Sequence, residues 1–186
     1  MDQGHLLRRA VHMTAPLFLI YYFLPENILG LNKNMWLGVG GVAVFIFEAW
    51  RLRFNISVIG MRKYEQGRIS AAAWFMLACL ITLPFFPLGY TLPVFLGMGF
   101  VDPLIGELRL RSSKLYPWLP TLIYFLLAGG SLVYVFGLET YVIVAAVVAT
   151  ALAIWVEGLK TEILDDDFTM IVVPLVGIAL TFRLLG

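Results

Sequence analysis

The chain has 186 residues, of which 61% are hydrophobic and 13% are charged, and its formal net charge is +1. A soluble domain carries about 25% charged residues, so this composition, with a mean hydropathy of +0.89, excludes an ordinary water-soluble protein. No basic domain that could neutralise nucleic-acid phosphates is present in the sequence, which argues against nucleic-acid binding.

Apolar stretches recur along the chain and predict an all-α, polytopic helix bundle that forms one integral membrane domain over residues 1–186. The first apolar stretch follows Arg8 and Arg9 without a small-residue cleavage pattern, so we interpret it as a retained span rather than a signal peptide. We expect about seven spans, near residues 13–31, 35–50, 71–88, 91–106, 118–136, 139–157 and 168–185.

Basic residues are divided unevenly between the two sides that seven crossings create. With the N-terminus in the cytoplasm, eleven of the thirteen Lys and Arg residues fall on the cytoplasmic side, and only Lys33 and Arg183 fall on the other. Cytoplasmic loops carry such an excess, so we expect a cytoplasmic N-terminus. Ten of the twelve acidic residues fall on or near the same side. Carboxylates contribute little to orientation, and a polar site on the cytoplasmic face would explain their clustering.

Two groups of candidate site residues precede the third span. Arg9 and His12 are possible site residues, although a lone histidine is more often a satisfied hydrogen-bonding group. Arg62, Glu65 and Arg68 recur every three residues, so they would share one helical face. They are candidates for binding nucleotide phosphates, and the alternative is a solvated, positively charged loop.

The fourth span is expected to break at Asp102-Pro103, a pair typical of a helix start. An N-cap is therefore one interpretation of Asp102. The functional alternative is that an ionisable side chain near membrane depth marks a site, where a carboxylate could hold Mg²⁺ against nucleotide phosphates. Glu107 is a further possible site residue. The basic residues that follow, Arg109, Arg111 and Lys114, could clamp phosphates or anchor the loop.

Glu157 is followed eight residues later by three adjacent carboxylates, Asp165, Asp166 and Asp167, just before the last span. Acidic residues favour a helix N-terminus, and Asp167 could be the cap. Three neighbouring like charges repel one another, and a bound divalent cation would relieve that repulsion. Hard oxygen ligands suit Mg²⁺ or Mn²⁺, so we expect a metal site built from Asp102 and the Asp165–Asp167 group.

Four motifs occur in a recognisable order along nearly the whole chain. They are Arg8-Arg9-Ala10-Val11-His12, Glu65-Gln66-Gly67-Arg68-Ile69-Ser70-Ala71-Ala72, Asp102-Pro103, and Glu157 with Asp165-Asp166-Asp167-Phe168-Thr169. Their order and spacing resemble the dolichol kinase, phytol kinase and CTP-dependent diacylglycerol kinase family of integral membrane lipid-alcohol kinases.

The resemblance implies transfer of the γ-phosphoryl group of CTP, or of another nucleoside triphosphate, to a polyprenol-, dolichol- or phytol-like alcohol in the bilayer. The reaction would take place at the cytoplasmic face with Mg²⁺ or Mn²⁺. The resemblance assigns Asp102 and Asp165–Asp167 to the metal–nucleotide site, with supporting roles for Glu157 and the Arg62/Glu65/Arg68 face. We expect Asp102, Glu157 and Asp166 to carry catalysis.

Three features depart from the family pattern. No Lys-Ser/Thr-x-Glu-Gly motif follows Asp102, Asp167 stands where the family commonly has Asn, and Pro174 lies about one turn later than in the family. Two other functions stay open at this point. One is a lipid-phosphate cytidylyltransferase that uses CTP, and the other is a non-catalytic membrane protein or small transporter. Nothing in the sequence indicates an oligomeric state.

Overall fold

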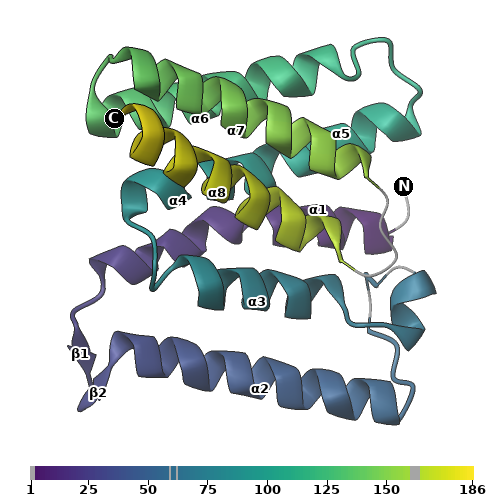
Figure 1. Cartoon of the computed structure of the whole chain (residues 1–186). Helices are drawn as coiled ribbons and strands as arrows, with labels where there is room; N and C mark the ends of the chain where they lie inside the picture. The colour runs from purple at the N-terminus through teal and green to yellow at the C-terminus, as the bar shows by residue number, and fades with distance from the viewer. Residues whose placement is uncertain (1–2, 59, 62, 160–163) are drawn as a thin grey trace.

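The structure is a computed structural model that describes residues 3–58, 60–61, 63–159 and 164–186 (Figure 1). The described part is all-helical apart from one two-stranded hairpin. In chain order the elements are α1 (Gln3–Met13), η1 (Ala15–Phe23), β1 (Asn27–Ile28), β2 (Leu31–Asn32), α2 (Lys33–Arg53), η2 (Lys63–Gly67), α3 (Ala71–Thr82), α4 (Leu88–Leu96), η3 (Gly97–Val101), α5 (Asp102–Leu110), α6 (Trp118–Phe136), α7 (Thr140–Gly158) and α8 (Asp166–Leu185). Segments η1 and η2 are 3-10 helices, and η3 is a π-helix.

Five helical segments in the described part of the chain are long and apolar enough to cross a membrane. They are α2, the continuous rod formed by α4, η3 and α5, and the helices α6, α7 and α8. Each coincides with a predicted span, and α3 occupies the first part of the predicted third span as a shorter helix. The prediction of an all-helical fold is therefore confirmed, while the number of crossings stays a prediction.

The predicted first span, 13–31, is wrong in its bounds. The helical structure begins at Gln3, and η1 ends at Phe23. Beyond it the chain turns back through the β1–β2 hairpin, where Leu29 and Gly30 both have positive φ angles, of 50° and 81°. Positive φ at both central positions is the conformation of a type I′ hairpin turn, so the apolar stretch does not continue as a helix.

The expected break at Asp102-Pro103 is also absent. Residues Leu88–Leu110 form one continuous helical rod, and Asp102 has helical dihedral angles of φ −58° and ψ −51°. The irregularity is the π-helical η3, where the Asp102 N–H donates to the Gly97 carbonyl five residues earlier. This wider turn accommodates Pro103, whose ring collides with the preceding turn in a regular α-helix. Asp102 is therefore inside the rod and is not an N-cap.

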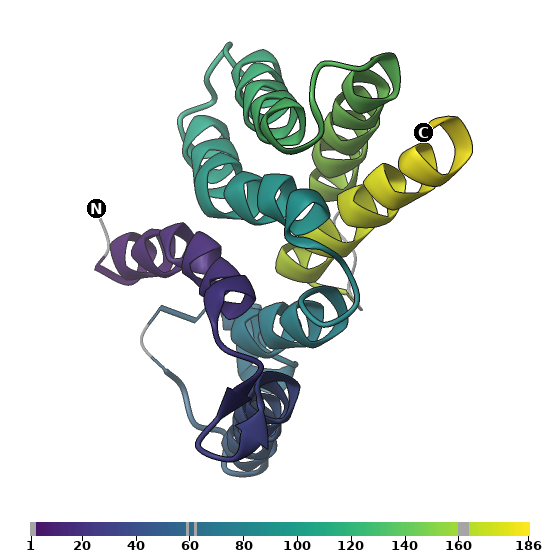
Figure 2. The same ribbon diagram turned by 90° about the vertical axis from the view of Figure 1, so that its left-hand side faces the viewer.

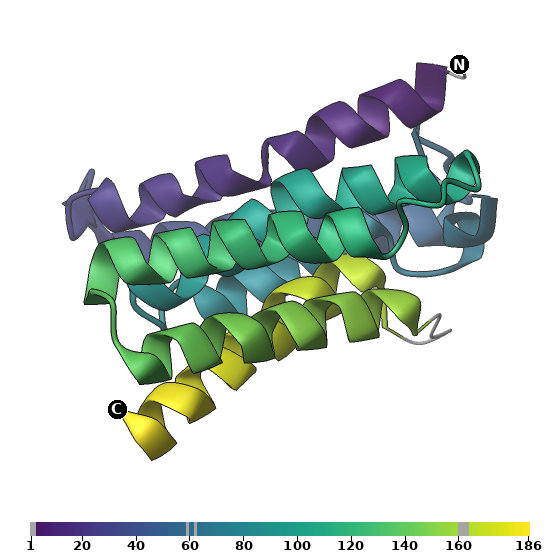
Figure 3. The same ribbon diagram turned by 90° about the horizontal axis from the view of Figure 1, so that it is seen from above.

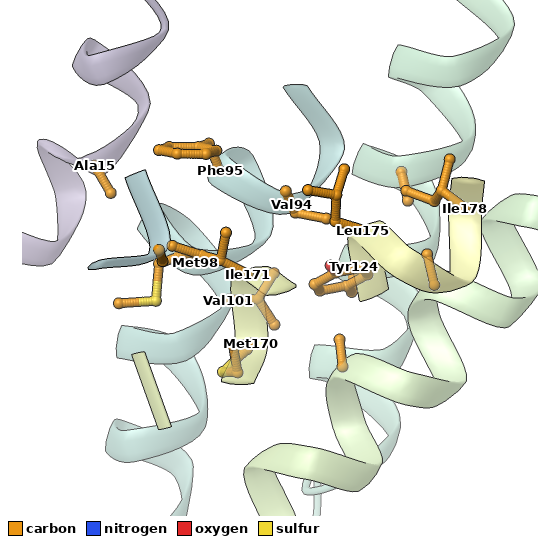
Figure 4. Close-up of a cluster of buried hydrophobic side chains, with 14 of the residues drawn as sticks. Ala15, Val94, Phe95, Met98, Val101, Tyr124, Met170, Ile171, Leu175 and Ile178 are labelled. Atoms are coloured by element: carbon orange, nitrogen blue, oxygen red, sulfur yellow. The ribbon is translucent and has the colours of Figure 1, made fainter. Parts of the chain in front are cut away.

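The hydrophobic core lies where the rod packs against α6 and α8. Figure 4 shows Phe95, Met98 and Val101 of the rod close to Tyr124 of α6 and Ile171 of α8. All five side chains are at most 1% exposed. This packing fixes the rod, and with it Asp102, relative to the beginning of α8.

Small residues allow α7 and α8 to pack closely along their length. Ala145, Ala149 and Ala153 of α7 are fully buried. On α8, a Cβ atom at Gly177 would lie 2.5 Å from Leu152 Cδ1. Helix association inside a bilayer depends on such close approach, because lipid is as apolar as the side chains and hydrophobic burial adds little.

The helices run roughly side by side, and their connections gather at two opposite ends (Figures 1 and 3). The polar end carries the N-terminus, the α2–α3 and α5–α6 connections, the end of α7 and the beginning of α8. The hairpin end carries β1–β2, the connections from α3 to α4 and from α6 to α7, and the C-terminus. The connections that the seven-span prediction places in the cytoplasm, α2–α3, α5–α6 and α7–α8, thus begin and end at the polar end.

Exposed aromatic side chains lie near both ends of α2 and α6. Trp36 and Trp50 of α2 are 39% and 50% exposed, and Trp118 and Tyr134 of α6 are 77% and 88% exposed. Trp50 and Trp118 are close to the polar end, whereas Trp36 and Tyr134 are close to the hairpin end. Trp and Tyr are enriched where a membrane meets water. These residues therefore indicate the heights of two membrane–water interfaces along the outer surface, which we call the aromatic levels.

Helix α2 is the outermost element and packs mainly against α3 and β2 (Figure 2). Near the middle of α2, a Cβ at Gly41 would lie 2.7 Å from Leu80 Cδ1 of α3, so the missing side chain lets the two helices meet. Near the polar end, α2 is joined to the beginning of α3 by hydrogen bonds from Ser70 to Glu48. Between α2 and α1 the helices diverge and leave a cavity.

Candidate functional site

Three polar side chains from distant parts of the chain meet inside the bundle. His12 of α1, Asp102 of α5 and Asp167 of α8 are 8%, 8% and 4% exposed. His12 Nδ1 lies 3.8 Å from Asp102 Oδ2 and 3.8 Å from Asp167 Oδ1. One possible ligand atom from each of the three residues lies within 4.8 Å of the others. We call this group the His12–Asp102–Asp167 cluster.

The position of His12 depends on a glycine in the π-helical segment. A Cβ at Gly99 would lie 2.7 Å from Pro16 Cδ and 3.4 Å from the His12 carbonyl oxygen. The absence of a side chain at Gly99 therefore allows the junction of α1 and η1 to rest directly on the rod. This contact places His12 beside Asp102, which follows η3 in the chain.

The beginning of α8 orients Asp167 toward the interior. Asp165, not Asp167, is the N-cap: its side chain accepts a hydrogen bond of 3.2 Å from the Asp167 N–H. Asp165 satisfies one of the N–H groups at the helix end. The Asp167 carboxylate is therefore not used as the cap, and it lies in the cluster. Asp166 is only partly buried. The three consecutive carboxylates also form a second group whose oxygens lie within 4.8 Å of one another.

The cluster offers two kinds of chemistry. Mg²⁺ sites in nucleotide-dependent enzymes use one or two carboxylates and complete the coordination with substrate phosphates and water. Asp102 and Asp167 fit that requirement. The imidazole lies beside them, with Nε2 accepting a 3.3 Å hydrogen bond from Arg8 Nε. Carboxylates near Nδ1 favour a proton on that nitrogen, so Nε2 carries the lone pair that accepts from Arg8 and becomes basic only when Arg8 moves away. The group can therefore hold a cation and move a proton.

The cluster borders a cavity of about 450 Å³ between α1, η1, α2 and α3. His12 and Asp167 lie in its lining, together with Arg8. Most of the remaining wall is apolar, and it includes Val11, Phe18, Val44, Phe47, Phe75, Met76 and Met98. The cavity thus joins a long apolar wall to a small polar group, which is the shape of a site for an amphiphile.

Other predicted site residues form a network that ties α5 to its neighbours. Glu107 forms ion pairs with both Arg9 of α1 and Arg111. Arg109 NH1 lies 2.6 Å from Glu157 Oε1 of α7. Glu157, expected among the catalytic residues, thus pairs with Arg109 and is not one of the three residues of the cluster. These contacts hold α1, α5 and α7 together at the polar end.

Two predicted phosphate-binding residues, Arg109 in the last turn of α5 and Lys114 in the α5–α6 connection, differ in their surroundings. The Arg109 guanidinium carbon lies 4.8 Å from the centre of the Tyr116 ring, so this side chain is engaged by both an aromatic face and Glu157. Lys114 is exposed. Of these two cations, Lys114 is the one open to an anion arriving from outside.

The predicted Arg62/Glu65/Arg68 face falls in the α2–α3 connection. Arg62 lies outside the described residues. Glu65 is 3% exposed, whereas the Arg68 side chain is exposed. The local structure is the short 3-10 helix η2, Lys63–Gly67, which ends before Arg68. Glu65 borders the cavity, so this part of the connection covers one end of it.

Sequence reasoning missed the pair that holds this connection in place. Arg51 is 1% exposed, and its Nε and NH2 donate to the Glu48 carboxylate at 2.9 Å and 2.7 Å. NH2 also donates to the Arg68 carbonyl at 2.6 Å. The Ser70 N–H and hydroxyl complete the shell of Glu48 at 2.6 Å and 2.9 Å. Two opposite charges three residues apart inside an apolar helix were the available signal.

Comparison with known proteins adds no name to this site. No protein family, curated protein or solved structure matches the chain.

Proposed function

We propose that the protein is a multi-pass membrane phosphotransferase that moves the γ-phosphoryl group of CTP to the hydroxyl of a membrane lipid alcohol. The observation that carries this proposal is the position of the His12–Asp102–Asp167 cluster at the edge of a largely apolar cavity. A lipid alcohol has this combination of a long apolar body and one polar group. The resemblance to lipid-alcohol kinases supports the choice of reaction and donor.

The proposed arrangement in the membrane has seven crossings with the polar end in the cytoplasm. Five segments meet the length and hydropathy of a span, and the α1–η1 segment and α3 would supply the other two. The Lys and Arg excess at this end supports its cytoplasmic placement. A water-soluble nucleotide would then approach the cluster from the polar end, while the alcohol would approach from the bilayer.

The chain's own residues can perform the required steps. In the transfer, the lipid oxygen bonds to the γ-phosphorus, the bond from that phosphorus to the bridging oxygen breaks, and CDP leaves. His12 Nε2 would take the hydroxyl proton after Arg8, which donates to this nitrogen, turns toward the triphosphate, while Asp102 and Asp167 favour the resulting positive charge on the imidazole. Bound Mg²⁺ would neutralise the phosphate charge, and Asp102 and Asp167 are the residues that would hold it.

Positive charge for the nucleotide would come from the polar end. Arg8 borders the cavity beside His12, and Lys114 and Arg68 are exposed. Phosphoryl transfer depends mainly on positioning and on neutralising charge. These three side chains are therefore proposed to attract and orient the triphosphate, while Arg109 keeps its structural pair with Glu157.

The experiment that tests this function uses purified protein in lipid nanodiscs, γ-labelled CTP, Mg²⁺ and a panel of long-chain alcohols. Asp102→Asn preserves the shape of the side chain but removes its charge. We expect this variant to fold with an unchanged melting temperature and to lose turnover by at least about a hundredfold. Asp166→Asn, which changes a partly exposed neighbour of the cluster, is the comparison variant and is expected to lose less.

Three outcomes would contradict the proposal in different ways. Near-normal turnover in Asp102→Asn would remove the cluster from the reaction. Release of pyrophosphate, with incorporation of label from α-labelled CTP into added lipid phosphates, would identify a cytidylyltransferase instead of a kinase. Absence of Mg²⁺-dependent nucleotide binding in the wild-type protein would favour a non-catalytic membrane protein.

A further inference from the structure

The cavity beside the cluster has an apolar wall that would not be needed to bind a nucleotide. Its surface between α1 and α2 consists of aliphatic and aromatic side chains, including Val11, Val44 and Phe47. A triphosphate requires hydrogen-bond donors and cations along its length. The apolar wall matches a second ligand with a hydrocarbon chain.

Two of the charged groups that border the cavity, Glu48 and Arg51, are paired with each other inside the protein. The Arg51 guanidinium and Glu48 carboxylate make a two-point contact, and Ser70 completes the shell of Glu48. These groups close one side of the cavity without needing a ligand. His12 and Asp167, next to Asp102, and Arg8, which contacts His12, are polar groups at the other side. An occupant with a single polar head would match this distribution.

The packing of α2 suggests how such a ligand enters. Among the described residues, α2 packs extensively only against α3 and β2, although it forms one wall of the cavity opposite α1. In Figure 2, α1 lies at the left of the view and α2 at the bottom. The outward face of α2 is apolar and exposed, with Val42 and Ile46 at 58% and 65%, as expected for a helix in contact with lipid.

We propose that the cavity between α1, η1, α2 and α3 binds the hydrocarbon chain of the acceptor alcohol, which enters from the bilayer between α1 and α2. The hydroxyl then lies at His12 and Asp167, and the part of the chain nearest to it contacts Val44, Phe47 and Met76. A volume of about 450 Å³ is in the range of ligand cavities, about 300–1,000 Å³. This assignment rests on the proposed function for its choice of an alcohol.

The test pairs two identical substitutions on α2. Val44→Phe adds a ring to the cavity wall, whereas Val42→Phe adds the same ring to the exposed face two residues away. The probe is a long-chain alcohol with a photoreactive diazirine on its chain, added to protein in nanodiscs. Labelled residues are mapped by mass spectrometry, and KM is measured for the alcohol and for CTP.

In the wild-type protein we expect saturable labelling of cavity residues on α1, α2 and α3. Val44→Phe is expected to reduce cavity labelling and to raise KM for the alcohol by at least about tenfold, while KM for CTP is unchanged. Val42→Phe is expected to match the wild type in both measurements. The wild-type labelling map also tests the proposal if Val44→Phe does not insert into the membrane.

The cavity assignment and the kinase function can fail separately. Labelling spread over the outer surface, and equal in the two variants, would overturn the cavity assignment even in an active kinase. Saturable cavity labelling that Val44→Phe removes, in a protein without phosphotransferase activity, would support the cavity as a lipid-chain site and would reject the proposed reaction.

Discussion

Gly99 is the contact through which α1 and η1 rest on the central rod, and replacing it by Ala tests how the cluster is assembled. The added Cβ would lie 2.7 Å from Pro16 Cδ and 2.9 Å from Pro16 Cγ. Carbon atoms in contact prefer about 3.5–4.0 Å, so the proline ring would have to retreat by about 0.8 Å. Because the ring is bonded to the backbone, this retreat would also move His12 away from Asp102.

The expected loss is larger in activity than in stability. Overpacking of this kind costs about 1–3 kcal/mol, and each kcal/mol lowers the melting temperature of a chain of this size by about 2–4 °C. A displacement of about 1 Å in a catalytic group can reduce a rate about a hundredfold. We therefore expect Gly99→Ala to remain folded and to lose turnover by about a hundredfold in the γ-labelled CTP assay.

Gly106→Ala is the matched control, because it lies in the same rod and a Cβ there would meet nothing within 4 Å. In a helix interior this change is expected to stabilise by up to about 1 kcal/mol and to leave turnover unchanged. Thermal unfolding and turnover are measured for both variants in the same nanodiscs. If Gly99→Ala behaves like Gly106→Ala in both measurements, the contact with Pro16 does not position His12.

Two further predictions concern the buried pair and the topology. Arg51→Met leaves Glu48 buried without its cation and is expected to lower the free energy of unfolding by about 3–5 kcal/mol. The control, Arg53→Met at an exposed position, should change it by no more than about 0.5 kcal/mol. Equal melting temperatures of the two variants would show that Glu48 does not need Arg51. Ser113→Cys is expected to react with a membrane-impermeant maleimide in inside-out vesicles only, with the fully buried Cys79 as background. Labelling from outside intact cells would reverse the proposed orientation.

Long apolar runs made the later helices predictable. The run from Trp118 to Phe136 is bounded by Pro117 and Gly137, so both its type and its limits are visible in the sequence. The first helix was misplaced because α1 contains polar residues such as Gln3 and Arg9, which a search for apolar length passes over. The π-helical η3 was missed because its glycines indicate a break as readily as a wider turn.

The candidate site was predicted in part. Asp102 and Asp167 were expected to share a site, and the structure brings them together. His12 was only a possible member, because its meeting with residues about 90 and 155 positions later depends on tertiary packing through Gly99. Glu157 was expected in the same group, and in the structure its carboxylate pairs with Arg109. Charge pairing between helices is not visible in the spacing of either residue.

The aromatic levels on α2 and α6 have a consequence for the surrounding bilayer. Trp36 and Trp50 are fourteen residues apart, and Trp118 and Tyr134 are sixteen residues apart. At a rise of 1.5 Å per residue these intervals correspond to about 21 Å and 24 Å, whereas a typical hydrocarbon core is about 30 Å thick. Hydrophobic mismatch of this size favours a thin membrane or thins the lipid around the protein. In such a depression the head groups would lie closer to the buried histidine, which would shorten the distance over which a lipid hydroxyl must leave the interface.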